Sequence, residues 1–454
     1  MFLEVYVMDR KEYLDTLAEQ IRSKPAAAAV RREIEDHIEE QKEAFLAQGM
    51  SGSEAEEAAV QEMGDPVETG VAMDLIHRPQ MPWGSIALIA FLSVAGMAFR
   101  FLLAAKLPDV IFMTGDVTTQ GIYLCLGLAL MIGICLADYS RIGRRARTWT
   151  LVLALALLAG NTFTGVVVNG MSGYLYFMGY VVSISLIWPL FAPLYGGIVY
   201  HYQKKGYLGL GMCLLWTLPG VIAAASCSGP GAALLLLIID LVILGIAVWK
   251  KWFPAARKKV LFGLGCAVIL LPALSAGITL LFGNEYQKVR LAALFGRVDQ
   301  GGNWARQTLQ DILGSSKLIG ASQQMLDQEE AFSAADFVLT YITGYYGILA
   351  ALVLIGLILY LVFRLFRVSL QQKNRLGMLM GAGSAVVMTA QVLIYVLCNM
   401  GIILPGTIYC PFLTGGGTVM LVTYVIFGIL LSVYRYQDIP LEEGERARRL
   451  SLDK

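Results

Sequence analysis

One aspartate in this sequence has both the right chemistry and a position where catalysis could use it. Asp336 lies in Ala-Ala-Asp-Phe, where a polar segment gives way to an apolar run. As a general base, it would accept a proton from an attacking hydroxyl, an assistance worth about 10²–10⁴-fold in rate. Alternatively, Asp336 is only a helix N-cap, which stabilises a helix by about 1 kcal/mol. Both interpretations stay open here.

The remaining titratable residues give weaker signals. Asp240 interrupts the apolar run LLLLIIDLVILG, and an acid in mid-span is costly enough to indicate either a structural hydrogen bond or a function. The three histidines, His37, His77 and His201, are far apart. The cysteines form no CxxC pair, so we predict neither a metal site nor a disulfide framework.

The elements that position these residues are mostly membrane spans. Hydrophobic residues make up 57% of the 454 residues, charged residues only 15%, and the mean hydropathy is +0.63. A soluble core could not bury that much apolar surface, and a helix needs about 20 apolar residues to cross the bilayer. We predict an all-α polytopic bundle with spans at 84–105, 118–138, 148–166, 178–200, 207–226, 231–249, 259–282, 337–363, 376–402 and 412–434.

Basic residues give the orientation, because cytoplasmic loops carry an excess of Lys and Arg. Every second loop is basic, which predicts that both termini are cytoplasmic and that residues 437–454 form a cytoplasmic tail. On the opposite side lies one long loop, 283–336, and loops of that length tend to carry function. The basic clusters are Arg141, Arg144, Arg145 and Arg147; Lys204 and Lys205; Lys250, Lys251, Arg257, Lys258 and Lys259; Arg364, Arg367, Lys373 and Arg375; and Arg435.

Residues 9–79 predict a small cytoplasmic helical domain in front of the membrane domain at 83–436. Helix N-terminal signatures recur in it, and one helix carries its apolar residues a turn apart on a single face. We therefore expect four helices that are soluble and helical when expressed alone. The signatures are Asp9 with Glu12, Pro25, Ser51 with Glu54, and Asp65-Pro66 with Glu68; the apolar face is Val30, Ile34, Ile38 and Phe45; and Gly49 ends the second helix.

The run from Ile34 to Gly70 resembles the permease-prefix (HAAS-type) domain that precedes various bacterial membrane proteins. The resemblance is carried by GMSGSEA at 49–55 and by MGDP at 63–66. The alternative is a generic helical bundle with a solvated acidic face.

Five short motifs in the second half, in order and spacing, resemble the SEDS family of FtsW, RodA and SpoVE. They are RLAALFGRVD at 290–299; Gln307 and Gln310 followed by ILGSSKLIGAS at 312–322; Asp336-Phe337, opening span eight, with Gly347; Asn399-Met-Gly; and Pro411 to Thr418. Asn169-Gly170 and Gly231 to Leu234 are fainter matches.

This resemblance implies a peptidoglycan glycosyltransferase that polymerises lipid II at the outer face of a bacterial cytoplasmic membrane, with a class B penicillin-binding protein as partner. It makes Asp336 the catalytic base. The other site residues that it implies, for substrate binding, are Arg290, Gln307, Gln310, Lys317, Ser322, Asn399, Pro411, Thr414 and Gly416. We expect the chain to contact membrane lipids and not to bind nucleic acid. The resemblance identifies no cofactor, and a divalent cation stays open.

The chain also departs from the family pattern. The family's span four supplies a glutamate and a lysine in QPSExxK, whereas residues 180–197 here have no ionisable side chain except tyrosines. The acidic pair of the family's EELG is Gly344-Tyr345. A diphosphate donor needs cations, and the long loop offers Lys288, Arg290, Arg297, Arg306 and Lys317. The alternative function is therefore a diverged membrane protein that binds or moves a polyprenyl-linked substrate, or recruits partners for cell-wall synthesis. Division, elongation and sporulation stay open as its process.

Overall fold

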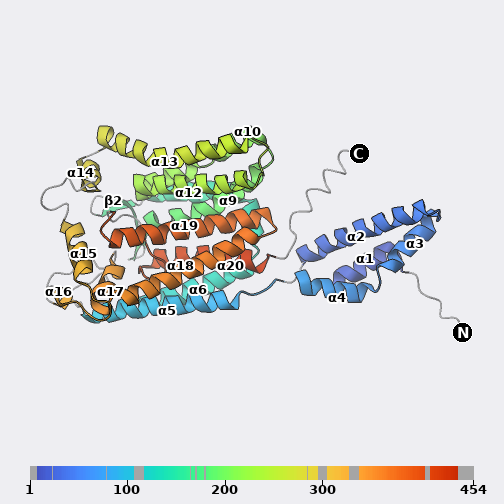
Figure 1. Cartoon of the computed structure of the whole chain (residues 1–454), viewed down its shortest axis with the longest axis horizontal. Helices are drawn as coiled ribbons and strands as arrows, with labels where there is room; N and C mark the ends of the chain where they lie inside the picture. Colours follow the sequence, from blue (N-terminus) through green and yellow to red (C-terminus); the bar gives the residue numbers. More distant parts are fainter. Residues whose placement is uncertain are drawn as a thin grey trace. The chain divides into compact units, whose positions relative to one another are not determined.

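The computed structural model describes residues 8–22, 24–77, 79–106, 117–163, 165–168, 171–177, 180–283, 285–294, 304–326, 337–403 and 409–437. The chain divides into two compact units. Among the described residues, the first comprises those before Pro82 together with 372–375 and 434–437, and the second comprises those within 82–371 and 376–433. Both are built mainly from helices (Figure 1).

The first unit contains the four helices expected ahead of the membrane domain. They are α1 (Arg10–Glu19), α2 (Lys24–Ala47), α3 (Gly52–Glu62) and α4 (Pro66–His77). The apolar face of α2 is confirmed, because Val30, Ile34 and Ile38 are buried in the core and Phe45 packs against it. Tyr436, just after the last span, packs against the same core, whereas residues 438–454 of the expected tail lie outside the described residues.

The helix caps of the first unit follow the sequence signatures in two of three places. Ser51 and Glu54 form the expected capping box, in which each side chain accepts a hydrogen bond from the other residue's backbone amide. Asp65 Oδ1 accepts a hydrogen bond from the Val67 amide at 2.7 Å. Asp9 stands at the N-cap of α1 but makes no capping hydrogen bond, so the capping box proposed there is wrong.

The second unit is a bundle with ten candidate membrane spans among the described residues. Two spans combine shorter elements: two 3₁₀ segments (Ile184–Leu186 and Trp188–Leu190) and α9 make the fourth, and α10 with α11 makes the fifth. The helices are α5 (Trp83–Lys106), α6 (Val117–Leu136), α7 (Tyr139–Arg144), α8 (Ala146–Phe163), α9 (Phe191–Tyr202), α10 (Gly206–Leu215), α11 (Leu218–Ser228), α12 (Pro230–Trp249), α13 (Arg257–Phe282), α14 (Glu285–Leu294), α15 (Trp304–Ser315), α16 (Gln323–Leu326), α17 (Val338–Tyr346), α18 (Ile348–Gln371), α19 (Arg375–Asn399) and α20 (Gly417–Arg435).

A small antiparallel sheet interrupts the expected all-helical pattern. Strands β1 (Gly165–Val168), β2 (Met171–Phe177) and β3 (Tyr180–Ser183) pair in sequence order, and β2 contacts α8 and α11. The predicted spans 148–166 and 178–200 included residues of this sheet. Hydropathy alone favours a span here, but the Val and Tyr residues favour strands, and Asn-Gly between them is typical of a hairpin turn.

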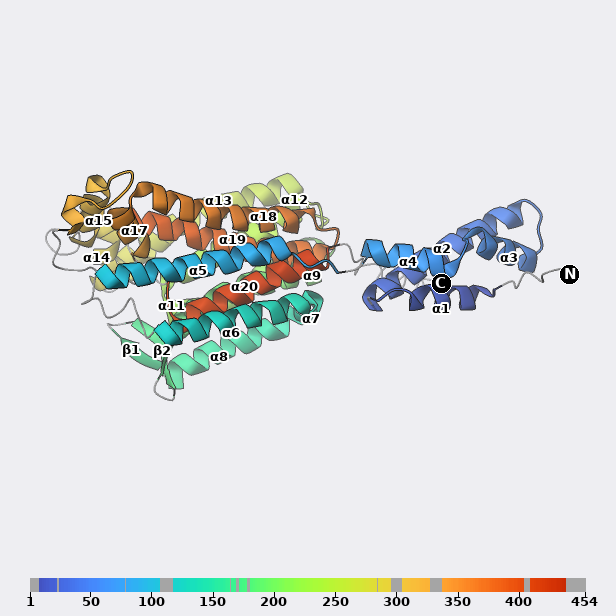
Figure 2. The ribbon, with the colours of Figure 1, turned by 90° about the horizontal axis from the view of Figure 1, so that it is seen from below.

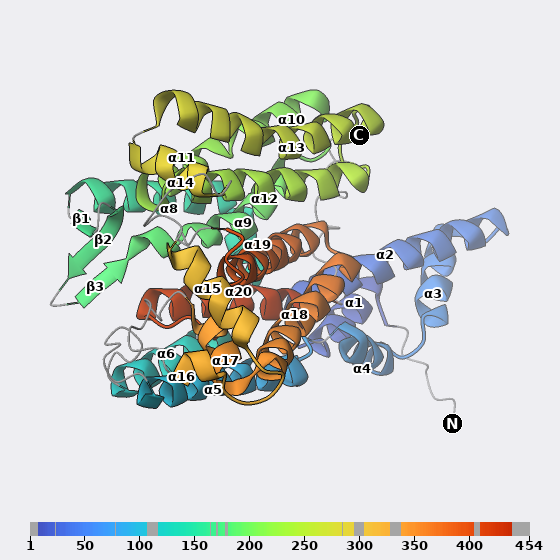
Figure 3. The same cartoon turned by 60° about the vertical axis from the view of Figure 1, so that its left-hand side comes forward.

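The sheet and helices α14 to α17 lie at the same end of the bundle in two perpendicular views, and we call it the loop end (Figures 1 and 2). Figure 3 turns this end forward and shows α15 and α17 close to the ends of α18 and α19. The most buried spans are those of α9, α19 and α20, whereas α13 buries no residue. The core therefore lies around α9, α19 and α20, and it supports the loop end.

Candidate functional site

The first turn of α17 is held by the end of α19. The Thr340 amide donates to Asn399 Oδ1 at 3.0 Å, and the Thr340 hydroxyl donates to the Asn399 carbonyl oxygen at 3.0 Å. Asn399 Nδ2 in turn donates to the Tyr395 carbonyl oxygen at 3.0 Å. Thr340 and Asn399 are both buried. Asn399, which the family resemblance offered for substrate binding, thus uses its side chain to seat the helix that follows Asp336.

This seating bears on the two interpretations of Asp336, which lies outside the described residues. The N-cap position of α17 is Phe337, and the Thr340 amide that a cap would satisfy already pairs with Asn399. Helix capping of α17 therefore does not require the Asp336 side chain.

The expectation that Asp336-Phe337 opens span eight is wrong. The chain forms the separate helix α17 and then breaks at Gly347, whose φ is +97°, before span eight begins at Ile348. A Cβ at Gly347 would lie 2.6 Å from the Leu318 carbonyl oxygen. The break is therefore imposed by a packed neighbour, which a hydropathy pattern does not report.

That neighbour is the glycine-rich motif itself. Residues 317–322 run beside 344–349, with backbone hydrogen bonds from Ser322 N to Gly344 O at 2.9 Å and from Ile348 N to Lys317 O at 3.0 Å. Ser322 is buried, and its hydroxyl accepts a hydrogen bond from the Met325 amide at 3.2 Å. Two segments that matched family motifs separately are thus one packed unit at the loop end.

The other proposed substrate-binding residues of the long loop, where their side chains are described, are not buried in this packed unit. Gln307 and Gln310 lie on α15 and are exposed, as is Lys317. The aliphatic part of Gln310 lies near Gly401, just beyond α19. Arg290 lies on α14, but its side chain is outside the described residues. The described residues thus bring Ser322 and Asn399 into the interior and leave the two glutamines at the surface.

Residues 409–416 form an irregular segment that enters the bundle beside α5. Tyr409 and Cys410 are fully buried, and Phe412 has a positive φ of 69°. A Cβ at Gly96, within α5, would lie 2.1 Å from the Phe412 carbonyl oxygen. Irregular backbone at membrane depth is tolerated where protein covers it, and Gly96 permits this close approach.

The proposed residues of this segment shape its turn. Pro411 is buried, and the Cys410 amide donates to Thr414 Oγ1 at 2.9 Å, which closes the turn around Pro411. Gly416 has a φ of +116°, and the two glycines beside it pack closely, Gly415 against Arg100 and Gly417 against Tyr123. Close packing therefore accounts for glycine at 415 and 417, and the positive φ accounts for glycine at 416.

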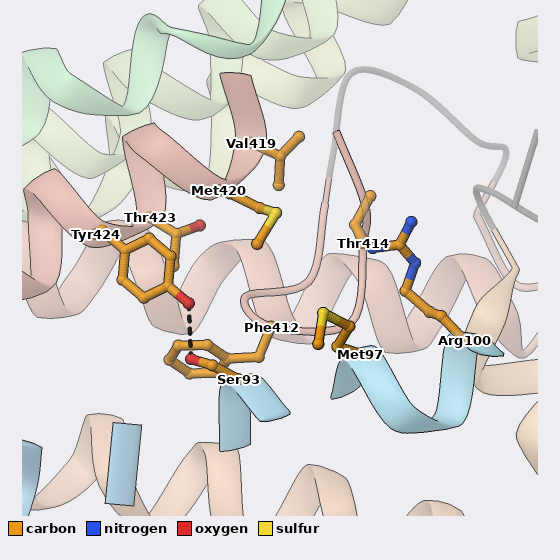
Figure 4. Close-up of a pocket in the computed structure, with 9 residues that line it drawn as sticks. All are labelled: Ser93, Met97, Arg100, Phe412, Thr414, Val419, Met420, Thr423 and Tyr424. Atoms are coloured by element: carbon orange, nitrogen blue, oxygen red, sulfur yellow. Dashed lines mark hydrogen bonds between the residues drawn. The ribbon is translucent and has the colours of Figure 1, made fainter. Parts of the chain in front are cut away.

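A cavity of about 20 Å³ lies between α5 and α20, and Phe412 and Thr414 of the 409–416 segment also line it (Figure 4). Its walls combine apolar side chains with hydroxyls and one guanidinium, and the Tyr424 hydroxyl donates to Ser93 Oγ at 2.8 Å. The lining residues are Ser93, Met97, Arg100, Phe412, Thr414, Val419, Met420, Thr423 and Tyr424. This volume holds about one water molecule.

Arg100 is a site residue that the sequence reasoning missed. It is a buried arginine within span one, and its Nη1 donates to Gln120 Oε1 at 3.2 Å. The signal was available, because an arginine inside a span of 24 residues is unusual whatever the family pattern says.

Two expectations concern ligands outside this region. Asp240 is buried in α12, and its Oδ1 has no hydrogen-bond partner among the described residues, so the structural hydrogen bond considered for it is not seen. No three His, Cys, Asp or Glu side chains converge within the described part of the chain. The structure therefore offers no set of residues to assign to a divalent cation.

Comparison with known proteins identifies a family whose sequences resemble this chain. A family model described as cell cycle protein, covering FtsW, RodA and SpoVE, matches residues 83–439. Proteins named probable peptidoglycan glycosyltransferase FtsW are similar. The one from Geobacter metallireducens is 26% identical over 328 residues, covering 69% of this chain and 83% of that protein. The one from Alcanivorax borkumensis is 26% identical over 394 residues, covering 82% and 97%.

Solved structures share the fold. A chain of a peptidoglycan synthase complex, described as coordinating polymerization and crosslinking, superposes with a TM-score of 0.64 at 20% identity, covering 78% of this chain and 98% of that one. The rod shape determining protein RodA of Thermus thermophilus gives a TM-score of 0.54 at 18% identity, covering 79% and 97%. With the family match over residues 83–439, these likenesses show that the chain is a multi-pass membrane protein of the FtsW, RodA and SpoVE family, the SEDS proteins.

Proposed function

We propose that this chain is a peptidoglycan glycosyltransferase that polymerises lipid II at the outer face of the bacterial cytoplasmic membrane. The relatives named as such glycosyltransferases support this activity. The structural observation that carries it is the packing at the loop end, where segments 317–322 and 344–349 and the Thr340–Asn399 contact surround the helix that begins just after Asp336.

In the proposed reaction, Asp336 is the general base. The hydroxyl of an acceptor sugar attacks the anomeric carbon of the donor, and its proton passes to the Asp336 carboxylate. The bond between that carbon and the diphosphate oxygen breaks, and its electron pair leaves with the polyprenyl diphosphate. The rigid seat of α17 on Asn399 favours this role, because general-base catalysis needs a fixed distance to the attacking hydroxyl.

A second function is favoured by one specific feature. Residues 180–197, the counterpart of the family's charged span-four motif, contain no Lys, Arg, Asp or Glu. A chain without those charges could bind or move a polyprenyl-linked substrate, or recruit cell-wall enzymes, without catalysing polymerisation.

The proposed partner is a class B penicillin-binding protein. The fold neighbour with a TM-score of 0.64 comes from a peptidoglycan synthase complex, which supports an assembly of this kind. We also propose that the permease-prefix-like first unit and both termini are cytoplasmic, because every second loop is basic.

Cysteine-accessibility labelling tests the orientation. A cysteine at Ser315 should react from outside the cell, whereas cysteines at Arg145, Lys258 and Lys373 should be protected until the membrane is permeabilised. Labelling of Ser315 and Lys258 from the same side would overturn the proposed topology.

Asp336→Asn tests the mechanism, because it keeps the size of the side chain and removes the proton acceptor. Polymerisation of lipid II by the purified chain, with a class B penicillin-binding protein present, should fall by about 10²-fold or more at unchanged abundance. Asp311→Asn is the matched control, since Asp311 is an exposed acid on α15, and it should polymerise normally.

Two results would reject these assignments. Full activity of Asp336→Asn would remove this residue from the mechanism. Absence of polymerisation by the wild type, with every partner and divalent cation tried, would favour the non-catalytic alternative.

A further inference from the structure

Arg100 places a charge inside a membrane span, and such a placement needs a physical reason. The residue lies in the last two turns of α5, which ends at Lys106, and only 8% of its surface is exposed. Charged side chains inside spans are costly and by default mark a functional site with an identifiable partner.

The guanidinium is held by neighbours that include Gln120 and the backbone at Gly415. Nη1 donates to Gln120 Oε1 on α6 at 3.2 Å, and this amide accepts a hydrogen bond without bringing a negative charge. On the other side, a Cβ added to Gly415 would lie 1.9 Å from Arg100 Nη2. The backbone of the 409–416 segment therefore packs directly against the guanidinium, and glycine at 415 makes room for it.

The same guanidinium forms one end of the cavity between α5 and α20 (Figure 4). The hydroxyls of Thr414 and Thr423 line that cavity as well. Thr423 Oγ1 is buried without a well-directed hydrogen bond to the described residues. An arginine with adjacent hydroxyl donors is a set that suits phosphate oxygens, and the cavity of about 20 Å³ has room for one such oxygen rather than for a sugar.

The composition of span four makes a cation from elsewhere necessary for a diphosphate substrate. Residues 180–197 offer none. Among the described cations of the long loop, Lys317 is exposed, Lys288 and Arg306 are partly buried, and none of the three lines the cavity. Arg100 instead supplies positive charge from span one, inside the bundle and towards the loop end.

We propose that Arg100 binds a phosphate of a polyprenyl diphosphate lipid, the donor of the reaction proposed above, and so supports departure of the diphosphate. This inference rests on the proposed function and names the residue that takes the substrate's phosphate. When the bond from the anomeric carbon to oxygen breaks, the electron pair stays on the phosphate oxygen, and the guanidinium faces the charge that develops there.

Ligand binding tests this site without requiring turnover. The melting midpoint of the purified full-length chain in detergent is measured against increasing undecaprenyl diphosphate, undecaprenol, inorganic pyrophosphate and phosphatidylglycerol. Only undecaprenyl diphosphate should raise the midpoint at low concentration. An equal effect of undecaprenol would show that the site does not recognise the phosphate groups. An equal effect of pyrophosphate or phosphatidylglycerol would overturn the assignment to a polyprenyl diphosphate.

Variants then assign the binding to Arg100. Arg100→Met should raise the dissociation constant for undecaprenyl diphosphate by about 10- to 100-fold. Arg100→Lys should retain much of the wild-type affinity. Gly415→Ala should also weaken binding, because its Cβ displaces the guanidinium without removing the charge. These two variants keep the test decisive if Arg100→Met does not fold.

Arg147→Met is the matched control. Arg147 lies at the start of α8, at the opposite end of the bundle, where its guanidinium stacks over the Tyr202 ring at 5.9 Å. Its loss should leave the dissociation constant unchanged. Wild-type affinity in both Arg100 variants and in Gly415→Ala would refute the proposal.

Kinetics separate this proposal from the function on which it rests. If the wild type polymerises lipid II, Arg100→Met should raise KM and lower kcat, because the guanidinium holds the phosphate in the ground state and binds it more strongly as charge develops in the transition state. Unchanged KM and kcat would refute the role of Arg100 and leave the glycosyltransferase intact. Binding that depends on Arg100 in a wild type that never polymerises would refute the glycosyltransferase and support this site.

Discussion

The two units of this chain use different kinds of polar contact. In the first unit, charged side chains pair across helix surfaces, whereas in the second the buried contacts join neutral groups. The pairs of the first unit include Arg10 with Glu35 and Glu39, Arg31 with Asp15, and Lys42 with Glu56. The contacts of the second unit include Tyr424 with Ser93, Thr340 with Asn399, and Ser432 with the Ala137 carbonyl.

The solvent explains the difference. In water, an exposed ion pair contributes about 0–1 kcal/mol and the apolar core provides most of the stability. In lipid, apolar side chains gain little by leaving the hydrocarbon, so small residues and neutral hydrogen bonds hold helices together. Arg100 and Asp240 depart from this pattern, and it is this departure that marks Arg100 as a candidate for function.

Removing a buried leucine of the first unit should have the largest effect, and removing a lipid-facing leucine of the second unit should have almost none. Leu17 is fully buried there, so Leu17→Ala should cost about 2–5 kcal/mol in the urea unfolding of residues 8–79, which we expect to be helical alone. Leu352 on α18 is 63% exposed, and Leu352→Ala should leave the melting midpoint of the full-length chain nearly unchanged, because lipid replaces the lost contact. Equal losses from the two changes, or a random-coil circular dichroism spectrum of residues 8–79, would break the comparison.

A single added methyl group at a close backbone approach of the second unit should have the next largest effect. Gly96→Ala places its Cβ 2.1 Å from the Phe412 carbonyl oxygen, so we expect a loss of about 1–3 kcal/mol, seen as a lower melting midpoint of the full-length chain. Gly245→Ala on α12 meets nothing within 4 Å and should be neutral or slightly stabilising. A silent Gly96→Ala would mean that the 409–416 segment does not pack against α5.

Removing a cap should have the smallest effect, and its pH dependence identifies the charge involved. Ser51→Ala should cost about 1 kcal/mol near neutral pH in residues 8–79, measured by urea unfolding. Hydrogen bonds from the Ser51 hydroxyl and amide lower the pKa of Glu54. That contribution is present above the ordinary carboxylate pKa and is lost as the pH falls through the lowered value. Wild type should therefore lose part of its advantage over Ser51→Ala in acid, while the bond from the Glu54 amide to the Ser51 hydroxyl remains. Ser53→Ala, at the second residue of α3, should show no such pH dependence. A Ser51→Ala loss that is equal at neutral and low pH would exclude the Glu54 carboxylate from the cap.

The sequence by itself determined the spans, the first unit and the family. Runs of about 20 apolar residues predict helices wherever lipid is the solvent, and the ten candidate spans follow the predicted ones closely at most ends. Ser51-x-x-Glu54 predicts a cap because both partners lie within one turn. The family could also be identified, because its motifs are short stretches whose order and spacing can be recognised in the sequence without knowing what they contact.

Only the tertiary structure decided how the loop end is built. The break at Gly347 depends on Leu318, the path of Phe412 depends on Gly96, and the position of Arg100 depends on Gly415. Each pair joins residues from different elements, and most lie far apart in the chain. Hydropathy and local spacing carry no information about such pairs. The strands at 165–183 were missed for a related reason: Val and Tyr are apolar in a strand as in a span, and pairing between strands settles which one forms.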